Sequence, residues 1–351
     1  MEKKLLKGNQ AIAEAAIQAG CRFYFGYPIT PQNEIGEYMS KALPEVSGTF
    51  IQAESEVGAI NMVYGAAACG ARVMTSSSGL GIALKQEGIS NLCGAEVPAV
   101  IVNICRAGPG LGSIGPSQAD YNQMTRGGGP GDYHMIVYAP ETVQEMVHLT
   151  QEAFKKADEY RNPTAVLADG VLGQMMASVS IPDPNDLPTA PEKKWSLGQP
   201  DKRTYFSSLR TNNDELEQHN RNLQSKYELM KQKEVRIQLR ETEDADILIV
   251  AYGICARVAL KVQELAKADG IKVGIARPIT VWPFPYDEIF EASKSAKAVL
   301  CIEMSDGQMM HDVKLALKGA KPIHLYSKFG GNLPETNEIC TQIKRILSEV
   351  S

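Results

Sequence analysis

The stretch Glu54-Ser55-Glu56-Val57-Gly58-Ala59, which follows Tyr27-Pro28-Ile29-Thr30-Pro31 along the chain, indicates both the fold and the chemistry. It places two carboxylates at the start of a nearly uncharged helix of small residues that is expected to run to Gly70. Negative charge is favourable at a helix N-terminus, and the apolar residues that follow predict burial. Buried carboxyl groups can give or take a proton near neutral pH. Acidic pairs more often serve only as helix-capping charge, so the rest of the chain must decide.

Composition and charge argue against several classes of protein. With 351 residues, the chain is expected to form two domains. Its net charge of −5 provides no basic surface for nucleic acid or anionic lipid. No apolar run approaches the roughly 20 residues that span a bilayer. The 7 cysteines are scattered without a C-x-x-C pair, so neither an iron–sulfur cluster nor a structural zinc is expected in this chain. We expect a cytoplasmic protein with reduced thiols.

The first part of the chain, 1–180, alternates helix and strand patterns. We expect Asn9 to cap a helix that ends at Gly20, and Thr30 to cap a second helix that begins with Pro31. Strands are expected at 22–25, 49–52, 72–75, 97–104, 135–138 and 163–167. This αβαβ order predicts an α/β fold with a largely parallel sheet that is covered by helices on both faces.

Beyond Ile181 the composition changes. The segment 181–243 is expected to be a linker, and it carries a charged helix over 213–240. Its extended part is marked by Pro182, Pro184, Pro188, Pro191 and Pro200. A second, smaller α/β domain is expected over 244–351. Its elements are strands at 246–252, 271–276 and 298–303 and helices at 258–268 and 335–350.

Loops of unusual content follow the strands of the first domain, at 27–31, 52–56, 76–81 and 106–117. Parallel α/β sheets bind ligands at the carboxyl ends of their strands, so we expect these loops to form one site. Glu56 would supply proton transfer there, Thr30 and Ser76 to Ser78 would supply hydrogen-bond donors, and Arg106 would bind an anion.

The run Gly110-Leu111-Gly112-Ser113-Ile114-Gly115 matches the dinucleotide-binding pattern G-x-G-x-x-G. The match is weak, because Pro116 follows at once and the glycines begin several residues after the expected strand. A flexible loop beside the site is the favoured interpretation, and a dinucleotide site is the alternative.

These motifs resemble, in order and over the whole length, the subunit of 2-oxoacid:ferredoxin oxidoreductases that bears the thiamine pyrimidine-binding domain. The matching motifs are Gly8-Asn9-Gln10-Ala11, Tyr27-Pro28-Ile29-Thr30-Pro31, Glu54-Ser55-Glu56, Thr75-Ser76-Ser77-Ser78-Gly79 and Arg106-Ala107-Gly108-Pro109. The second domain, through Arg277-Pro278-Ile279-Thr280-Val281-Trp282-Pro283, resembles the transketolase C-terminal domain. The run Gly115-Pro116-Ser117-Gln118-Ala119-Asp120-Tyr121 is most similar to the 2-ketoisovalerate members and departs from the Pro-Ser-Thr-Gly run of the 2-oxoglutarate members.

The resemblance implies oxidative decarboxylation of a branched-chain 2-oxoacid to acyl-CoA and CO2 with thiamine diphosphate, with electrons passing to ferredoxin. It assigns Glu56 as the catalytic glutamate that hydrogen-bonds the pyrimidine, and the spacing to Gly65 favours Glu56 over Glu54. It assigns Thr30 and Arg106 to substrate binding. The other implied cofactor contacts are Tyr27, Pro28, Ile29, Ser77, Ser78 and Gly79.

One motif of thiamine enzymes is absent. The Gly-Asp-Gly and later Asn that bind Mg2+ and the diphosphate in this family are matched only by Ala-Asp-Gly at 168–170 and 268–270 and Ser-Asp-Gly at 305–307. The resemblance therefore implies a partner subunit that carries the Mg2+–diphosphate site, a ferredoxin-like iron–sulfur subunit, coenzyme A, ferredoxin, and self-association within a larger hetero-oligomer.

Three alternatives stay open at this point. The chain could belong to a 2-oxoglutarate or pyruvate ferredoxin oxidoreductase. It could be an NAD-dependent Rossmann dehydrogenase that uses Gly110 to Gly115. It could also be a non-catalytic interaction subunit that retains the fold, although Glu56, Thr30 and Arg106 argue against this.

Overall fold

A seven-stranded sheet forms the centre of the first domain in the computed structural model, which describes residues 2–182, 193–198 and 204–350. Its strands are β2 (Phe23–Gly26), β3 (Thr49–Gln52), β4 (Val73–Ser77), β5 (Val100–Cys105), β6 (Ile136–Tyr138), β7 (Thr164–Asp169) and β12 (Thr280–Trp282). Their order is β12-β6-β7-β5-β4-β2-β3, and every neighbouring pair is parallel except β12 with β6. β4, β5 and β7 are buried along their whole length, as is typical of a parallel sheet between helical layers.

The helices of this domain alternate with the strands, as the sequence predicts. They are α1 (Gly8–Gln18), α2 (Asn33–Glu45), α3 (Glu56–Ala68), α4 (Leu80–Gly94), α5 (Tyr121–Thr125), α6 (Val143–Tyr160) and α7 (Gly170–Gln174). α1 packs against α2 and α6, whereas α3 packs against α4. α3 begins where Ser55 accepts a hydrogen bond from the Gly58 amide, and α6 begins with the equivalent cap at Thr142.

Two of the expected helix caps are wrong. α2 begins at Asn33 rather than at Pro31, so Thr30 and Pro31 belong to the loop before the helix. The peptide bond between them is cis. Asn9 lies inside α1 rather than before it. Its side-chain amide donates to the Pro31 carbonyl at 2.7 Å and to Glu34, which holds the loop against α1. The Asn9 side chain therefore makes a tertiary contact to the loop instead of capping a helix.

A two-stranded antiparallel ribbon was not expected. β1 (Glu2–Lys7) pairs with β8 (Met176–Ile181). The buried side chains of Val179 and Ile181 pack on α1 and α6. The lysine-rich first strand gives little strand signal by itself, because only its pairing with β8 makes it extended.

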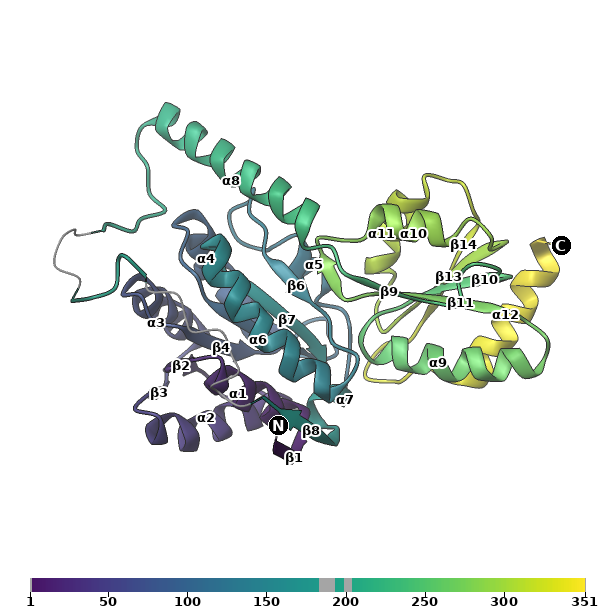
Figure 1. Ribbon diagram of the computed structural model, residues 1–351, viewed down its shortest axis with the longest axis horizontal. Helices are drawn as coiled ribbons and strands as arrows, with labels where there is room; N and C mark the ends of the chain where they lie inside the picture. The colour runs from purple at the N-terminus through teal and green to yellow at the C-terminus, as the bar shows by residue number, and fades with distance from the viewer. Residues whose placement is uncertain (1, 183–192, 199–203, 351) are drawn as a thin grey trace.

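The charged segment after the linker is shorter than expected. α8 (Asn213–Lys233) replaces the predicted helix over 213–240, and β9 (Ile237–Arg240) follows as a strand. Tyr227 and Met230 are buried on one face of α8, which lies along the first domain in Figure 1. Pro182 directly follows β8. The other prolines of the expected linker, Pro184, Pro188, Pro191 and Pro200, lie outside the described residues.

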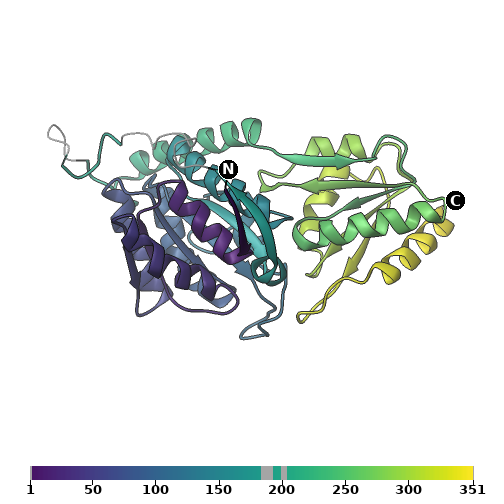
Figure 2. The same cartoon turned by 60° about the horizontal axis from the view of Figure 1, so that its bottom comes forward.

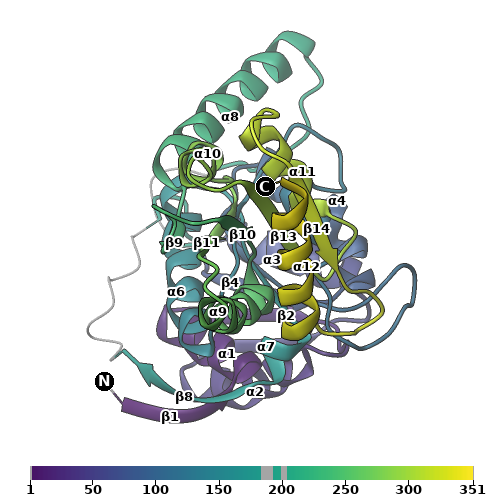
Figure 3. The same cartoon turned by 90° about the vertical axis from the view of Figure 1, so that its right-hand side faces the viewer.

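The second domain has a five-stranded sheet with the order β14-β13-β10-β11-β9, in which only β9 is antiparallel to its neighbour. Its other strands are β10 (Ile247–Val250), β11 (Val273–Pro278), β13 (Ala298–Glu303) and β14 (Ile323–Ser327). Its helices are α9 (Gly253–Ala268), α10 (Tyr286–Ala292), α11 (Gln308–Leu317) and α12 (Thr336–Val350). α9 and α12 cover one face of the sheet and α10 and α11 the other (Figures 1 and 3).

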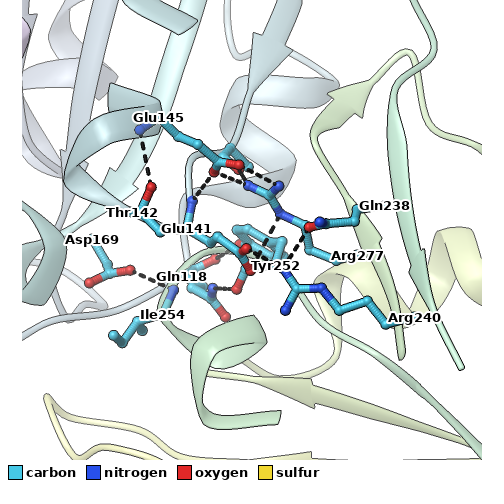
Figure 4. Close-up of polar contacts among 11 residues, drawn as sticks. Gln118, Glu141, Thr142, Glu145, Asp169, Gln238, Arg240, Tyr252, Ile254 and Arg277 are labelled. Atoms are coloured by element: carbon cyan, nitrogen blue, oxygen red, sulfur yellow. Dashed lines mark hydrogen bonds and ion pairs between the residues drawn. The ribbon is translucent and has the colours of Figure 1, made fainter. Parts of the chain in front are cut away.

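The two domains lie side by side (Figure 2) and are joined by a buried polar network. Figure 4 shows Arg277 of β11 paired with Glu145 of α6, and Arg240 paired with Glu141 at 2.6 Å. At the centre of the interface, the Gln118 side chain donates to the Tyr252 carbonyl at 2.9 Å. These contacts fix the second domain against loops that follow β5 and β6.

Two kinds of feature, membrane-spanning helices and metal-binding clusters, are absent from the described residues. Within the described residues, no helix combines the length and the apolar character needed to cross a bilayer. All 7 cysteines are free thiols, and no cluster of histidine, cysteine or carboxylate side chains able to hold a metal occurs in the part of the chain that the structure describes.

Candidate active site

The predicted site loops meet at the carboxyl edge of the seven-stranded sheet. The Arg106 guanidinium donates from Nη1 to the Thr30 carbonyl at 3.3 Å, which joins the loops after β5 and β2. Gly79, with a φ of 46°, lies so close to Arg106 that an added Cβ would be 3.5 Å from its Cγ. Two residues later, Gly81 lies against the Glu56 side chain. The loops after β2, β4 and β5 and the start of α3 therefore form one surface.

Glu56 is the first residue of α3, and only 6% of it is exposed. Its carboxylate accepts no hydrogen bond from any side chain or amide of the described residues. Glu54, by contrast, is exposed and lies over Gly58, where an added Cβ would collide with its carboxylate. The two carboxylates thus differ in their surroundings: Glu56 is largely enclosed, and Glu54 faces solvent.

Gly81, in the first turn of α4, allows this enclosure. A Cβ there would lie 2.6 Å from Glu56 Oε1 and would also overlap the Ser77 hydroxyl. Any larger residue would therefore push α4 away from both groups. The hydroxyls of Ser77 and Ser78 are buried and have no hydrogen-bond partner among the described residues. Since buried polar groups are nearly always paired in folded proteins, this free set points to a polar ligand.

The loop over 27–31 is held from below by a buried chain of hydroxyl and amide groups. The Tyr24 hydroxyl and Ser76 Oγ are 2.6 Å apart, and Ser76 Oγ also donates to the Gln32 side chain. Gln32 in turn donates to the Tyr27 carbonyl at 3.3 Å. Burial raises the pKa of Tyr24 to about 12, so its hydroxyl stays protonated. Above this support, Tyr27 and Pro28 are exposed and Ile29 is half-buried.

Arg106 faces a cavity of about 520 Å³ between the two domains. Its Nη2 donates to the Leu111 carbonyl at 2.9 Å, whereas its buried Nε has no partner among the described residues. Asp120 lines the same cavity, and burial raises the pKa of its carboxyl, which accepts a hydrogen bond from Asn103 at 3.0 Å. The second domain contributes Met304 and Phe329 to the wall. The cavity can hold a small anion with an apolar part.

Lys85 is the residue of this region that the sequence analysis missed. It lies one turn after Gly81 on α4 and is fully buried. Its Nζ donates to Thr75 Oγ1 at 2.7 Å and to the Ser76 carbonyl at 2.9 Å. Burial lowers the pKa of Lys85 to about 7, an effect that the nearby Glu56 charge opposes. In the sequence, Lys85 could have been noticed as the one lysine between the apolar stretches 80–84 and 88–89.

The glycine run from Gly110 to Gly115 does not form a dinucleotide site. It lies in the loop after β5, and its large side chains, Leu111 and Ile114, are 79% and 66% exposed. The next helix along the chain, α5, begins only at Tyr121. The dinucleotide fingerprint needs a helix that opens at the glycines, and this chain lacks one there.

Family models match nearly the whole chain. Residues 14–240 match the model "Pyruvate flavodoxin/ferredoxin oxidoreductase, thiamine diP-bdg". Residues 245–339 match "Pyruvate:ferredoxin oxidoreductase core domain II".

Relatives agree with these matches. The chain is 50% identical to ketoisovalerate oxidoreductase subunit VorB of Methanothermobacter marburgensis, over 99% of each chain. It is 35% identical to the 2-oxoglutarate synthase subunit KorA of the same organism, over 97% of this chain and 98% of that one.

Solved structures show the same fold. 2-Oxoglutarate:ferredoxin oxidoreductase from Magnetococcus marinus superposes with a TM-score of 0.90 at 26% identity, covering 98% of this chain and 65% of that one. A split-gene transketolase has a TM-score of 0.58 at 14% identity over 99% of both chains, a likeness of fold alone. The resemblance found in the sequence is thereby confirmed: this chain belongs to the pyruvate flavodoxin/ferredoxin oxidoreductase family, the 2-oxoacid:ferredoxin oxidoreductases, and carries the thiamine diphosphate-binding domain of that family.

Proposed function

We propose that this chain supplies the pyrimidine-binding half of the active site in a 2-oxoacid:ferredoxin oxidoreductase that acts on a branched-chain 2-oxoacid of the 2-ketoisovalerate type. The observation that supports this proposal most strongly is the Glu56 carboxylate, which accepts no hydrogen bond from the described residues and belongs to a residue that is 6% exposed. The unpaired hydroxyls of Ser77 and Ser78 lie at the same edge of the sheet. An enclosed carboxylate without a partner is suited to exchange a proton with a bound ring rather than to stabilise the fold.

The polar groups at this edge fit the pyrimidine end of thiamine diphosphate. When bound, this cofactor supplies the carbon nucleophile and electron sink that decarboxylation of a 2-oxoacid needs. Glu56 would hydrogen-bond the ring and hold the proton that the ring gives or takes. The remaining contacts would come from the loop residues at the two neighbouring strand ends, namely Tyr27, Pro28, Ile29, Ser77, Ser78 and Gly79.

Arg106 and Thr30 would bind the substrate. The unpaired Nε of Arg106 can donate to a 2-oxoacid carboxylate, a charge-assisted bond that a planar guanidinium forms well. Arg106 is also the one cationic side chain among the described residues that line the cavity, which otherwise contains the carboxylates of Asp120 and Asp306. A second carboxylate on the substrate would find no partner there. The cavity therefore favours a monocarboxylate with an apolar side chain over 2-oxoglutarate.

A partner subunit would complete the site. The sequence lacks the Gly-Asp-Gly and Asn ligands for Mg2+, so the diphosphate end must be held elsewhere. An exposed row on α3, Val57, Asn61 and Gly65, recurs every four residues and therefore lies on one helix face beside Glu56. We propose this face as the surface against which the Mg2+–diphosphate subunit packs. Iron–sulfur clusters would lie on a further, ferredoxin-like subunit, with coenzyme A and ferredoxin as the remaining reactants.

Reconstitution of the complex tests this function. The chain would be co-expressed with its partner subunits, and ferredoxin reduction would be measured with 2-ketoisovalerate, pyruvate and 2-oxoglutarate in the presence of thiamine diphosphate, Mg2+ and coenzyme A. We expect the highest kcat/KM with 2-ketoisovalerate and the lowest with 2-oxoglutarate. A preference for 2-oxoglutarate would contradict the role assigned to the cavity, and NAD reduction without ferredoxin would contradict the reaction class.

A further inference from the structure

Two segments of the second domain form its side of the cavity that contains Arg106. The first segment, directly after β13, contributes Met304, Ser305, Asp306 and Gln308. The second is the loop over 328–335, which follows β14 and contributes Phe329 and Gly330. Phe329 is the one aromatic side chain among the described residues that line the cavity, and 55% of it is exposed. Its ring therefore lies at the mouth of the cavity rather than in the core of the domain.

The segment after β13 is fixed against the first domain by hydrogen bonds. The Met304 amide donates to Gln118 Oε1 at 3.0 Å. The Met304 carbonyl accepts from the Gln118 amide at 3.0 Å and from the Ser117 hydroxyl at 3.2 Å. The Gln308 side chain donates to the Ala119 carbonyl at 2.7 Å. This part of the cavity wall is therefore held in place by the domain interface.

The loop over 328–335 meets the first domain in a different way. Gly331, with a φ of 96°, lies against Gly115 of the loop after β5. A Cβ added to Gly331 would lie 3.0 Å from the Gly115 Cα, and one added to Gly115 would lie 2.7 Å from the Gly331 Cα. The two loops run side by side in Figures 2 and 3, and no hydrogen bond joins them within the described residues. The contact is backbone against backbone, and it requires glycine at both positions.

The same loop is closed by its own hydrogen bonds around Phe329. The Lys328 amide donates to the Glu303 carbonyl at 3.1 Å, and the Lys328 ammonium forms an ion pair with Glu338 at 2.9 Å. The Asn332 amide and side chain donate to the Phe329 carbonyl at 3.2 Å and 3.0 Å. The backbone of Phe329 is thus positioned by the second domain, whereas the glycine contact sets how closely the loop approaches the first domain.

Arg106 and Phe329 line one cavity from different domains. In a 2-oxoacid the carboxylate and the side chain lie on opposite sides of the oxo carbon. A substrate whose carboxylate binds Arg106 therefore extends its side chain away from the guanidinium and into the cavity. The apolar groups available to it there include Leu80 and Ala83 of α4, Met304 and Phe329.

We propose that Phe329 is a specificity-determining residue: its ring closes the cavity over the apolar side chain of the 2-oxoacid, at a position set by the contact between Gly115 and Gly331. This role rests on the proposed function, in which Arg106 binds the substrate carboxylate. A branched side chain gains contact with the ring through its methyl groups, and a longer side chain meets the ring as an obstacle. Pyruvate, with a single methyl group, is too short to gain from it.

The substrate profile of Phe329→Ala in the assembled complex tests this role. One methylene in an apolar pocket is worth about 10- to 200-fold in kcat/KM, so we expect at least a tenfold loss with 2-ketoisovalerate and a change of about twofold or less with pyruvate. The kcat/KM with phenylpyruvate should rise. Phe290→Ala, on α10 outside this cavity, is the matched control and should leave the profile in place. An unchanged profile in Phe329→Ala, or an equal loss with pyruvate and 2-ketoisovalerate, would overturn the proposal.

The glycine contact is tested by Gly331→Ala. The added Cβ should push the two loops apart and change the ratio of kcat/KM for 2-ketoisovalerate and pyruvate in the same direction as Phe329→Ala. Gly319→Ala is the control, because Gly319 also has a positive φ, of 81°, but faces open space. An unchanged ratio in Gly331→Ala, or an equal change in Gly319→Ala, would contradict the part assigned to the contact.

Binding without turnover gives an independent measurement. Phe329 of the full-length chain is replaced by 4-trifluoromethylphenylalanine, and the assembled complex with thiamine diphosphate and Mg2+ is titrated with 2-ketoisovalerate in the absence of coenzyme A and ferredoxin. The fluorine resonance should shift saturably, and the same label at Phe290 should not respond. A label at Phe329 that does not respond would overturn the proposal, also where Phe329→Ala fails to assemble. Failure of the proposed function differs, because the wild-type complex itself would then turn over no 2-oxoacid or would prefer 2-oxoglutarate.

Discussion

The two domains differ in the hydrogen bonding of the buried polar groups that follow their parallel strands. In the first domain, Glu56, Ser77 and Ser78 are enclosed and lack hydrogen-bond partners among the described residues. In the second domain, Glu303 at the end of β13 is also fully buried, but it accepts hydrogen bonds from Ser305 at 2.7 Å and from the Met309 amide at 2.9 Å. The same residue type therefore meets a complete set of donors in one domain and an incomplete set in the other.

This difference distinguishes a carboxylate that stabilises the fold from one that is available to bind a ligand. A buried carboxylate that accepts amide hydrogens at the start of a helix satisfies that helix and stabilises the domain, as Glu303 does for α11. A buried carboxylate that accepts none adds no hydrogen bond to the fold and keeps its acceptors for a ligand. We therefore expect chemistry at the edge of the first domain, with the second domain acting as a wall of the cavity.

The largest effect is expected from substituting the two glutamates that differ between the domains, Glu56 and Glu303. Glu56→Gln in the assembled complex should reduce kcat by about 10²–10⁴-fold, because an amide cannot take or share the proton. Its thermal unfolding should match the wild type. Glu303→Gln should show the reverse, with near-normal kcat and a lower unfolding temperature. Steady-state ferredoxin reduction and thermal scans check both. If Glu54→Gln were inactive and Glu56→Gln active, the catalytic role would belong to Glu54.

The next effect concerns a carboxylate of the first domain that is fully paired. Asp169 accepts hydrogen bonds from the amides of Val171, Leu172 and Ile254, and so joins α7 to α9 of the other domain. Burial raises its pKa from 3.8 to about 6. Because the folded state binds this proton more tightly, its contribution to stability is fully present below pH 3.8 and is lost as pH rises through 6.

The loss amounts to about 3 kcal/mol at 1.36 kcal/mol per pKa unit. Asp169→Asn carries no titrating proton and should remove this slope. Urea unfolding of the wild type and of the variant between pH 4 and 7 makes the measurement, with Asp306→Asn as an exposed control. Parallel stability curves for wild type and Asp169→Asn would show that Asp169 does not titrate in this range.

A smaller effect is expected from substituting Arg106, the residue proposed to bind the carboxylate of the substrate. Arg106→Lys should raise KM for the 2-oxoacid by about 10- to 150-fold, because a lost charge-assisted hydrogen bond costs roughly 1.5–3 kcal/mol and an ammonium does not replace a planar guanidinium. Cofactor content should stay unchanged. Arg126→Lys, at the ion pair with Asp312 outside this cavity, is the control. An unchanged KM for every 2-oxoacid would rule out Arg106 as the carboxylate anchor.

Local patterns predicted much of this fold. β3 and β13 lie at the expected residues, and α3 begins at Glu56. β13 is a fully buried, mostly apolar run, and Ser55 caps the start of α3. The errors arise where distant contacts override local preference. Asn9 and Thr30 are typical capping residues, but the Asn9 side chain donates to the Pro31 carbonyl, and the Thr30 hydroxyl accepts from the Asn33 side chain rather than from a helix amide.

The site itself was predicted only as a set of loops. Resemblance singled out Glu56 and Arg106, but it could not reveal that Ser77 and Ser78 would be left unpaired or that Lys85 would be buried against Thr75 and Ser76. Those properties depend on the closeness of α4 to β4, which a glycine at 81 permits and which no residue spacing encodes.

The central claim is that this chain holds only half of a cofactor site, and calorimetry tests it most directly. Thiamine diphosphate with Mg2+ would be titrated into the purified full-length chain and into the chain assembled with the partner subunit that carries Gly-Asp-Gly. We predict weak or undetectable binding by the lone chain and tight, Mg2+-dependent binding by the assembly, because Glu56 and its neighbours contact one end of the cofactor only. Tight stoichiometric binding by the lone chain would contradict the claim.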